Sequence, residues 1–120
     1  MRLELKDIGI LVVYCAFMTI GQLGFKYVSL SLGKSMSLTD VAINLPFNIF
    51  FWVTGGVYFI STIYWTWLLT KIPLTIAYPF VSLTLVIVPC LSWVLFSETL
   101  TLVNLIGIAV IIVGIGLVVH

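Results

Sequence analysis

The stretch KIPLTIAYPFVSLTLVIVP, from Lys71 to Pro89, is almost entirely apolar and yet contains a tyrosine followed directly by a proline, Tyr78-Pro79. An apolar run of about 20 residues is long enough to cross the roughly 30 Å hydrocarbon core of a membrane as a helix. A proline within such a helix removes a backbone donor, which a membrane tolerates where other groups or a water-lined cavity satisfy the freed carbonyl. We therefore expect a membrane-spanning helix whose Tyr-Pro step lines a cavity or bends the helix.

The rest of the chain has the composition of a polytopic membrane protein. Hydrophobic residues make up 62% of its 120 residues and charged residues 8%, against about 45–50% and 25% in ordinary soluble domains. Because lipid cannot satisfy backbone hydrogen bonds, apolar runs of this length are expected to be helices. We predict an all-α membrane protein, one domain over residues 1–120, with four transmembrane helices at about 8–30, 47–69, 74–96 and 102–119.

The connections between these helices are short, with the exception of 31–46. In that segment Leu38, Val41 and Leu45 follow a helical spacing, which predicts a short interfacial helix over 38–45; a flexible loop is the alternative. Pro73 suits the first turn of a helix, so 47–69 and 74–96 should form an antiparallel hairpin.

Several functional classes lack the residues that they need. The sequence has no Walker-type loop, no Ser/His/Asp set and no metal-ligand spacing, so we expect no enzyme activity, cofactor or metal site. The net charge of +1 provides no nucleic-acid-binding patch. We interpret Cys15 and Cys90 as buried, unreactive thiols, and the tryptophans as interfacial anchors that do not contact ligand: Trp52, Trp65, Trp67 and Trp93.

One face of the first predicted helix carries polar and polarisable side chains at depth. Tyr14, Met18, Gln22 and Lys26 recur every four residues and so share that face. A lysine beside an amide and a phenol can hold a phosphate while an apolar tail stays in lipid. The alternative is that Lys26, about 10 Å from the midplane, reaches the headgroups as an interfacial anchor.

The third predicted helix offers a matching surface. Tyr78 and Ser82 lie one turn apart beside Pro79, so they are candidate substrate contacts; the alternative is a buried Tyr78 bonded to a neighbouring helix. No Asp or Glu lies within a predicted span, although a proton-coupled transporter normally needs a protonatable group there.

The last predicted helix is suited to close contact with another helix. Gly107 and Gly114 lie seven residues apart, on one side of that helix, and form a smooth groove. Because four helices enclose too little space for a transport pathway, we expect an oligomer with Gly107 and Gly114 at the interface.

The run IPLTIAYPFVSLTLVIVPCLSWVLFSETLTLVNLIGIAVIIVGI, from Ile72 to Ile115, resembles the C-terminal half of a domain of the drug/metabolite transporter superfamily. Its markers are Pro73 with Ile76-Ala77-Tyr78, Glu98 in the following turn, and the two glycines of the last helix. A four-helix chain of this length resembles an EamA-like half-transporter of two branches. These are the small multidrug resistance transporters and the paired subunits thought to flip aminoarabinose-phosphoundecaprenol.

Two positions favour the flippase branch. The multidrug branch has a glutamate where this chain has Met18 and a tryptophan where it has Val81, so that branch's cation-binding groups are missing. The segment Gly21-Gln22-Leu23-Gly24-Phe25-Lys26 and the Tyr78-Pro79 and Ser82-Leu83 pairs resemble segments of the flippase subunits. The resemblance implies a homodimer or heterodimer of four-helix chains packed through the last helix, in the bacterial inner membrane.

Three functional hypotheses follow. The first is a subunit of a lipid-linked sugar flippase, which moves a polyprenyl (undecaprenyl) phosphate-sugar with Lys26 and Gln22 at the phosphate. The second is an exporter of small cationic drugs or metabolites, in which Lys26 is an anchor. The third is a membrane accessory subunit of a glycosyltransferase that transports nothing.

Overall fold

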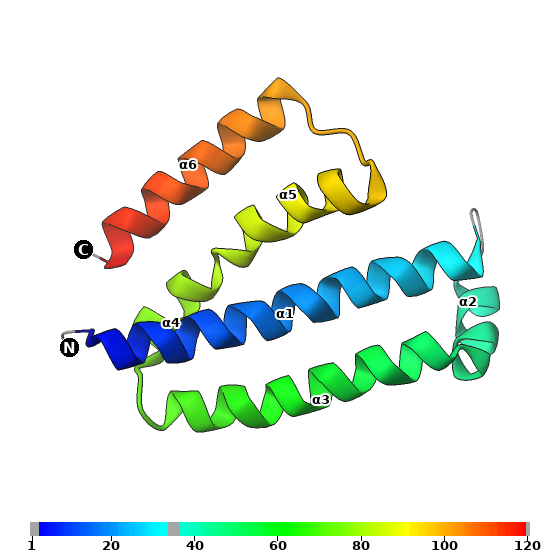
Figure 1. The fold of residues 1–120 in the computed structure, drawn as a ribbon, viewed down its shortest axis with the longest axis horizontal. Coiled ribbons are helices and arrows are strands. Elements are labelled where there is room, and N and C mark those ends of the chain that lie inside the picture. The colour runs from blue at the N-terminus through cyan, green and yellow to red at the C-terminus, as the bar shows by residue number, and fades with distance from the viewer. Residues whose placement is uncertain (1–2, 34–36, 120) are drawn as a thin grey trace.

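The computed structural model describes residues 3–33 and 37–119, and within these ranges the chain is helical, with turns and no strand (Figure 1). The all-α prediction is therefore confirmed for this part of the chain. The elements in order are α1 (Leu5–Leu32), α2 (Leu38–Asn44), the 3-10 turn η1 (Leu45–Phe47), α3 (Ile49–Leu69), α4 (Leu74–Val81), α5 (Thr84–Phe96) and α6 (Leu102–Val119).

Three stretches are long and apolar enough to cross a membrane: Leu5–Leu32, Ile49–Leu69 and Leu74–Phe96, the last containing both α4 and α5. This agrees with a membrane protein. The fourth predicted span, α6, is equally apolar but shorter, with 18 residues. Its insertion as a fourth span stays a prediction.

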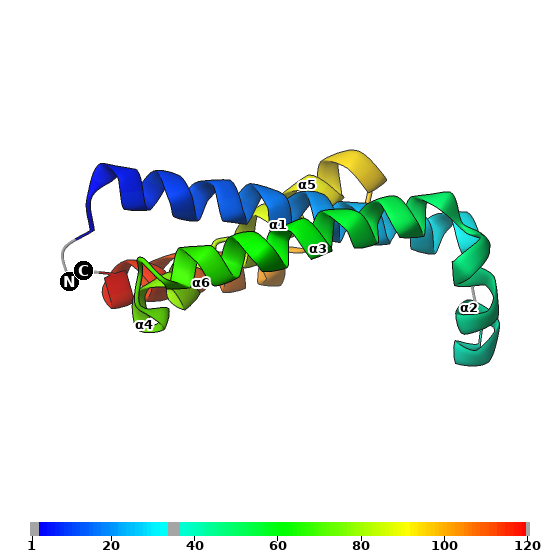
Figure 2. The same cartoon turned by 90° about the horizontal axis from the view of Figure 1, so that it is seen from below.

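The long helices lie in a flattened array. α1 and α3 run antiparallel along most of their lengths, α5 lies on the other side of α1, and α6 packs against α4 and α5 (Figure 1). The Cα dimensions are 47 × 37 × 21 Å, and the edge-on view shows α2 turning steeply away from the long helices (Figure 2). The helix predicted over 38–45 therefore forms, as α2 followed by η1, and the flexible-loop alternative is wrong.

Two glycines set the distance between α1 and α3. A Cβ atom at Gly21 would lie 2.5 Å from Tyr58 Cε2, and one at Gly24 would lie 2.6 Å from Thr54 Oγ1. Helices in lipid associate mainly through such close packing of small residues, because apolar burial drives association little there. This contact fixes the polar face of α1 in position relative to α3.

The span predicted as one helix over 74–96 is interrupted. α4 ends at Val81 and α5 begins at Thr84, so the break lies at Ser82 and Leu83, whereas Pro79 itself lies inside α4. The placement of the break at Pro79 is therefore wrong by three residues. Hydroxyls that bond to nearby carbonyls bend helices, but Thr19 and Ser61 make the same bonds within unbroken α1 and α3, so such bonds alone do not explain the break.

Candidate functional site

A pocket of about 390 Å³ lies where α1, α3 and the α4–α5 break meet. We call it the α1/α4 pocket. It brings together four of the six predicted substrate contacts, two from α1 and two from the interrupted span, although the two pairs lie at least 60 residues apart in the sequence. The lining residues are Tyr14, Met18, Trp65, Tyr78, Val81, Ser82, Thr84 and Leu85.

The Tyr14 side forms the fixed wall of this pocket. Tyr14 is buried, and its ring stacks on Trp65 with 4.7 Å between centroids and on Tyr64 at 6.3 Å. The Tyr64 hydroxyl in turn donates a hydrogen bond of 2.9 Å to the Ile10 carbonyl of α1. Stacked rings of this kind are rigid and amphipathic, so they present a preformed flat surface to a ligand.

Tyr78 has the opposite environment. It is 65% exposed, so the interpretation of Tyr78 as a buried tyrosine bonded to another helix is wrong. Its phenol lines the pocket from α4 and is free to turn toward a bound group. Met18 and Ser82 are half-buried between these two tyrosines.

Side chains satisfy the carbonyls around the helix break. Ser82 Oγ donates to the Tyr78 carbonyl at 3.2 Å, and Thr84 Oγ1 donates to the Val81 carbonyl at 2.8 Å. The Cys15 thiol of α1 approaches the Phe80 carbonyl at 3.8 Å. Each hydroxyl oxygen still has lone pairs to accept a hydrogen bond from a ligand, so the break remains a polar wall inside an apolar span.

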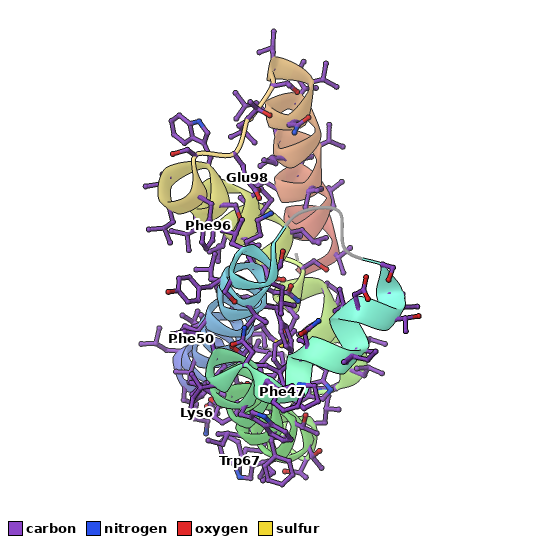
Figure 3. The ribbon with its side chains drawn as sticks, turned by 90° about the vertical axis from the view of Figure 1, so that its right-hand side faces the viewer. Lys6, Phe47, Phe50, Trp67, Phe96 and Glu98 are labelled. Atoms are coloured by element: carbon purple, nitrogen blue, oxygen red, sulfur yellow. The ribbon has the colours of Figure 1, made fainter. Side chains whose placement is uncertain are left out.

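Lys26 lies outside the pocket, further along α1. Its Nζ is 2.7 Å from Glu98 Oε1 in the turn between α5 and α6 (Figure 3, where Glu98 is labelled). The sequence predicted Glu98 in this turn but not its contact with Lys26. Sequence spacing could not predict this ion pair, because it depends on how α5 and α6 pack relative to α1.

Gln22 connects the two regions. It is exposed on α1, one helical turn from Met18 and one from Lys26. Eight residues of helix separate Met18 from Lys26, which corresponds to about 12 Å at 1.5 Å per residue. Met18 in the pocket, Gln22 and Lys26 therefore follow one another at intervals of one helical turn, with a drift of about 40° around α1 at each step.

Sequence reasoning did not place Trp65 at the pocket. We expected an interfacial anchor without ligand contact, and in the structure Trp65 stacks on Tyr14 and lines the α1/α4 pocket. Only the α1–α3 register brings these rings together, so position near a helix end was misleading. By contrast Trp52, Trp67 and Trp93 are exposed, and Lys71 Nζ lies 5.2 Å from the Trp67 ring.

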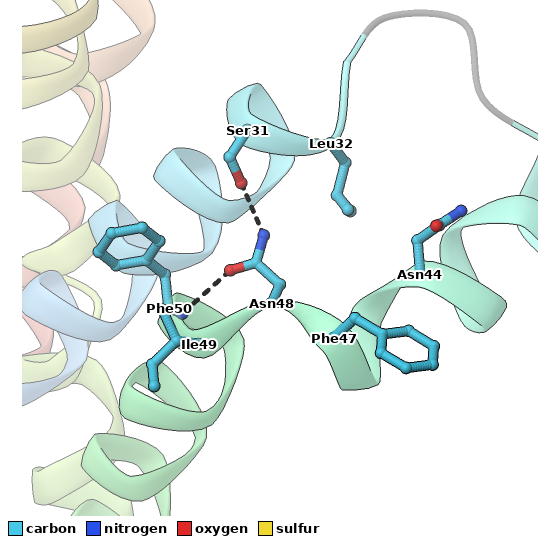
Figure 4. Close-up of a pocket in the computed structure, with 7 residues that line it drawn as sticks. All are labelled: Ser31, Leu32, Asn44, Phe47, Asn48, Ile49 and Phe50. Atoms are coloured by element: carbon cyan, nitrogen blue, oxygen red, sulfur yellow. Dashed lines mark hydrogen bonds between the residues drawn. The ribbon is translucent and has the colours of Figure 1, made fainter.

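A second pocket, of about 420 Å³, lies at the opposite end of α1 and α3 from the α3–α4 turn (Figure 4). Asn48 caps α3 there: its Oδ1 accepts from the Phe50 backbone N–H at 3.0 Å, and its Nδ2 donates to Ser31 Oγ at 2.7 Å. Because these polar groups bond to one another, they serve as a joint between the helices. An asparagine before an apolar run is a recognisable cap signal, but its Ser31 partner could not be predicted.

The remaining predicted residues lie outside both of these pockets. Gly107 and Gly114 are exposed on α6, and a Cβ atom at either would meet nothing within 4 Å. Neither glycine therefore makes a close helix–helix contact within the described chain. Cys15 is buried as expected, but Cys90 is exposed, so the expectation for Cys90 was wrong. Within residues 3–33 and 37–119 no three His, Cys, Asp or Glu side chains lie close enough to hold a metal ion.

Comparison with known proteins adds no relative. No family description, curated protein or solved structure matches this chain. Over residues 3–33 and 37–119 the structure defines a helical protein with three stretches long and apolar enough to cross a membrane.

Proposed function

We propose that the protein is a subunit of a flippase that moves a polyprenyl phosphate-linked sugar across the bacterial inner membrane. The observation that supports this most is the succession of the α1/α4 pocket, Gln22 and Lys26 along α1. It offers an aromatic surface with hydroxyl groups at one end and a cation at the other. A sugar phosphate has the same order of chemical groups.

Each part of this succession has a task in the proposal. The sugar ring packs on the Tyr14 and Trp65 rings, while Tyr78 and Ser82 exchange hydrogen bonds with its hydroxyls. Gln22 donates to the phosphate, and the Lys26 ammonium supplies charge-assisted hydrogen bonds that are roughly twice as strong as neutral ones. The polyprenyl chain remains in lipid, so the protein has to shield only the polar head.

The proposal includes a second chain and a fourth span. A flattened array 21 Å across leaves the exposed Tyr78 and Gln22 without a covering element from the described chain. A similar four-helix subunit, identical or not, would close the site, with α6 spanning the membrane and Gly107 and Gly114 in contact with the partner. Substrate would then cross between the two chains.

One observation favours a second candidate, an exporter of small cationic drugs or metabolites. The aromatic rings of Tyr14, Trp65 and Tyr78 line the same pocket, and aromatic faces attract cations by about 0.5–2 kcal/mol each. However, none of the eight lining residues is acidic, so the pocket has no charge to neutralise a cation. We therefore rank the anionic lipid headgroup first.

Native mass spectrometry of the protein extracted in a mild detergent tests the proposal. We expect a dimer that carries a polyprenyl-phosphate species in the wild-type protein and in Lys71→Ala, which removes a lysine at the end of α3 remote from Lys26. Lys26→Ala should lose that lipid, because Lys26 supplies the charge that holds the phosphate. A dimer without the lipid in every sample would contradict the flippase and favour the exporter, and a bound glycosyltransferase would favour the accessory role.

A further inference from the structure

One ion pair joins distant elements of the described chain, and it ties α1 to the turn between α5 and α6. Lys26 Nζ and Glu98 Oε1 are 2.7 Å apart, whereas the other ion pair, between Lys6 and Glu4, is local to the start of α1. The Lys26 and Glu98 side chains remain 38% and 43% exposed. An incoming anion can therefore reach the lysine without unfolding any element.

The turn that carries Glu98 has an unusual backbone. Ser97 adopts the left-handed conformation, with φ 54° and ψ 32°, and is the one non-glycine residue with positive φ in the described ranges. A non-glycine residue persists in this region only where its surroundings hold it there, and such residues cluster at switches and ligand sites. Here the Lys26–Glu98 contact is one of the interactions that hold the turn against α1.

The turn has few other polar ties. Thr101, at its end, bonds forward into α6, since Thr101 Oγ1 donates to Asn104 Oδ1 at 2.7 Å and accepts from the Asn104 backbone N–H at 3.2 Å. Apart from these contacts with α6, Glu98 makes the polar contact between residues 97–101 and the rest of the described chain. Loss of that contact would leave the turn without a polar contact to α1.

We propose that Glu98 is an internal anion that occupies Lys26 in the absence of substrate, and that the substrate phosphate displaces it. This inference rests on the proposed function. A carboxylate and a phosphate both seek the N–H donors of one ammonium, and two anions beside one cation repel each other in poorly solvated surroundings. The contacts of Gln22 and the α1/α4 pocket favour the substrate in this exchange.

Glu98 is then a positioning residue with two effects. It lowers the affinity of the site for phosphate, because the ligand has to break the ion pair before it binds. It also couples phosphate binding to release of the turn at residues 97–101 from α1. The same exchange in reverse would help to expel the substrate, since Glu98 competes for Lys26 throughout.

Titration of geranylgeranyl phosphate into the full chain in lipid nanodiscs tests the exchange. Glu98→Gln keeps the size of the side chain and removes its charge, so it should bind the probe roughly 1.4- to fivefold more tightly, the range expected for a partly exposed ion pair. Lys26→Gln should lose most of the affinity, and the double variant should match Lys26→Gln. Lys71→Gln serves as the matched lysine control, and geranylgeraniol, which lacks phosphate, should not distinguish the variants.

A second readout reports movement of the turn and does not depend on the stability of the variants. In a Cys90→Ser background, Thr99→Cys should react faster with a maleimide when geranylgeranyl phosphate is present, and Lys26→Gln should abolish the difference. If wild-type protein binds the probe through Lys26 but Glu98→Gln binds no more tightly and labelling does not change, the exchange is wrong and the phosphate site stands. If neither wild type nor Glu98→Gln binds the probe, the proposed function fails and the exchange with it.

Discussion

Tyr78 and Tyr14 line the same pocket from different helices, but they differ in burial. Tyr14 is buried and stacked on Trp65, whereas Tyr78 is 65% exposed. Burial of the first ring stabilises the contact between α1 and α3, while exposure of the second leaves its hydroxyl free for a ligand. At the residue scale, the function should therefore depend more on Tyr78, and the fold more on Tyr14.

Tyr78→Phe tests this division. Removal of one hydroxyl that bonds a ligand costs about 0.5–1.5 kcal/mol, so transport should slow by roughly two- to tenfold with no loss of folded protein. The measurement is the transport rate per amount of folded protein, beside the thermal unfolding midpoint. Tyr27→Phe, at an exposed tyrosine outside the pocket, is the control; an equal loss of activity and stability in Tyr78→Phe would show a structural role instead.

Part of the site could be predicted from residue spacing and part could not. The four-residue repeat placed Tyr14, Met18, Gln22 and Lys26 on one face of α1, because helical periodicity is a local property. The contacts of Trp65 and Glu98 depend on how separate helices are packed, and a single sequence carries no signal for that register. Tyr78 and Ser82 also reach the site from another element, but their hydroxyls beside Pro79 identified them without knowledge of that register.

At the scale of elements, the α1–α3 pair is the best-packed part of the molecule. Tyr58 and Thr54 of α3 lie so close to Gly21 and Gly24 of α1 that a Cβ atom at either glycine would clash with them. Three of the four predicted spans correspond to stretches long and apolar enough to cross a membrane, because the length of an apolar run is set by membrane thickness. The break at residues 82–83 was not located correctly, because the proline that suggested it lies inside α4, three residues before the break.

Gly21→Ala should weaken this pair while Gly9→Ala should not. The added methyl at Gly21 meets the Tyr58 ring at 2.5 Å, whereas at Gly9, on the same helix, it meets nothing within 4 Å. Overpacking of this kind costs about 1–3 kcal/mol, and alanine in an open helix position is neutral or stabilising by up to about 1 kcal/mol. Unfolding in mixed micelles by a denaturing detergent measures both, and equal stability of the two variants would contradict the close approach.

At the scale of the whole molecule, our proposal of a partner chain rests on the flattened shape and the exposed face of α6. α6 rests on α4 and α5, while Gly107 and Gly114 are exposed. In lipid, small residues exposed in this way allow another helix to approach closely. The sequence predicted the glycine spacing, but the identity of the partner helix is not encoded in it.

Gly107→Leu and Gly114→Leu should therefore reduce dimer formation. Gly116→Leu is the matched control, because Gly116 is also exposed with open space around it but lies about 200° around the helix from Gly114, at 100° per residue. Single-molecule photobleaching in liposomes counts the subunits of each variant. A dimer fraction that falls equally in all three variants, or in none, would contradict an interface through Gly107 and Gly114.

The most direct test of the central claim is a flipping assay with the purified protein in liposomes, using a fluorescent short-chain polyprenyl phosphate-sugar and a reagent that destroys fluorescence on the outer leaflet. We predict that wild-type protein exposes the inner-leaflet probe to the reagent, that Lys71→Ala does the same, and that Lys26→Ala slows this at least tenfold. Protection of the inner-leaflet probe by wild-type protein as complete as in empty liposomes, with the protein folded and dimeric, would contradict the flippase.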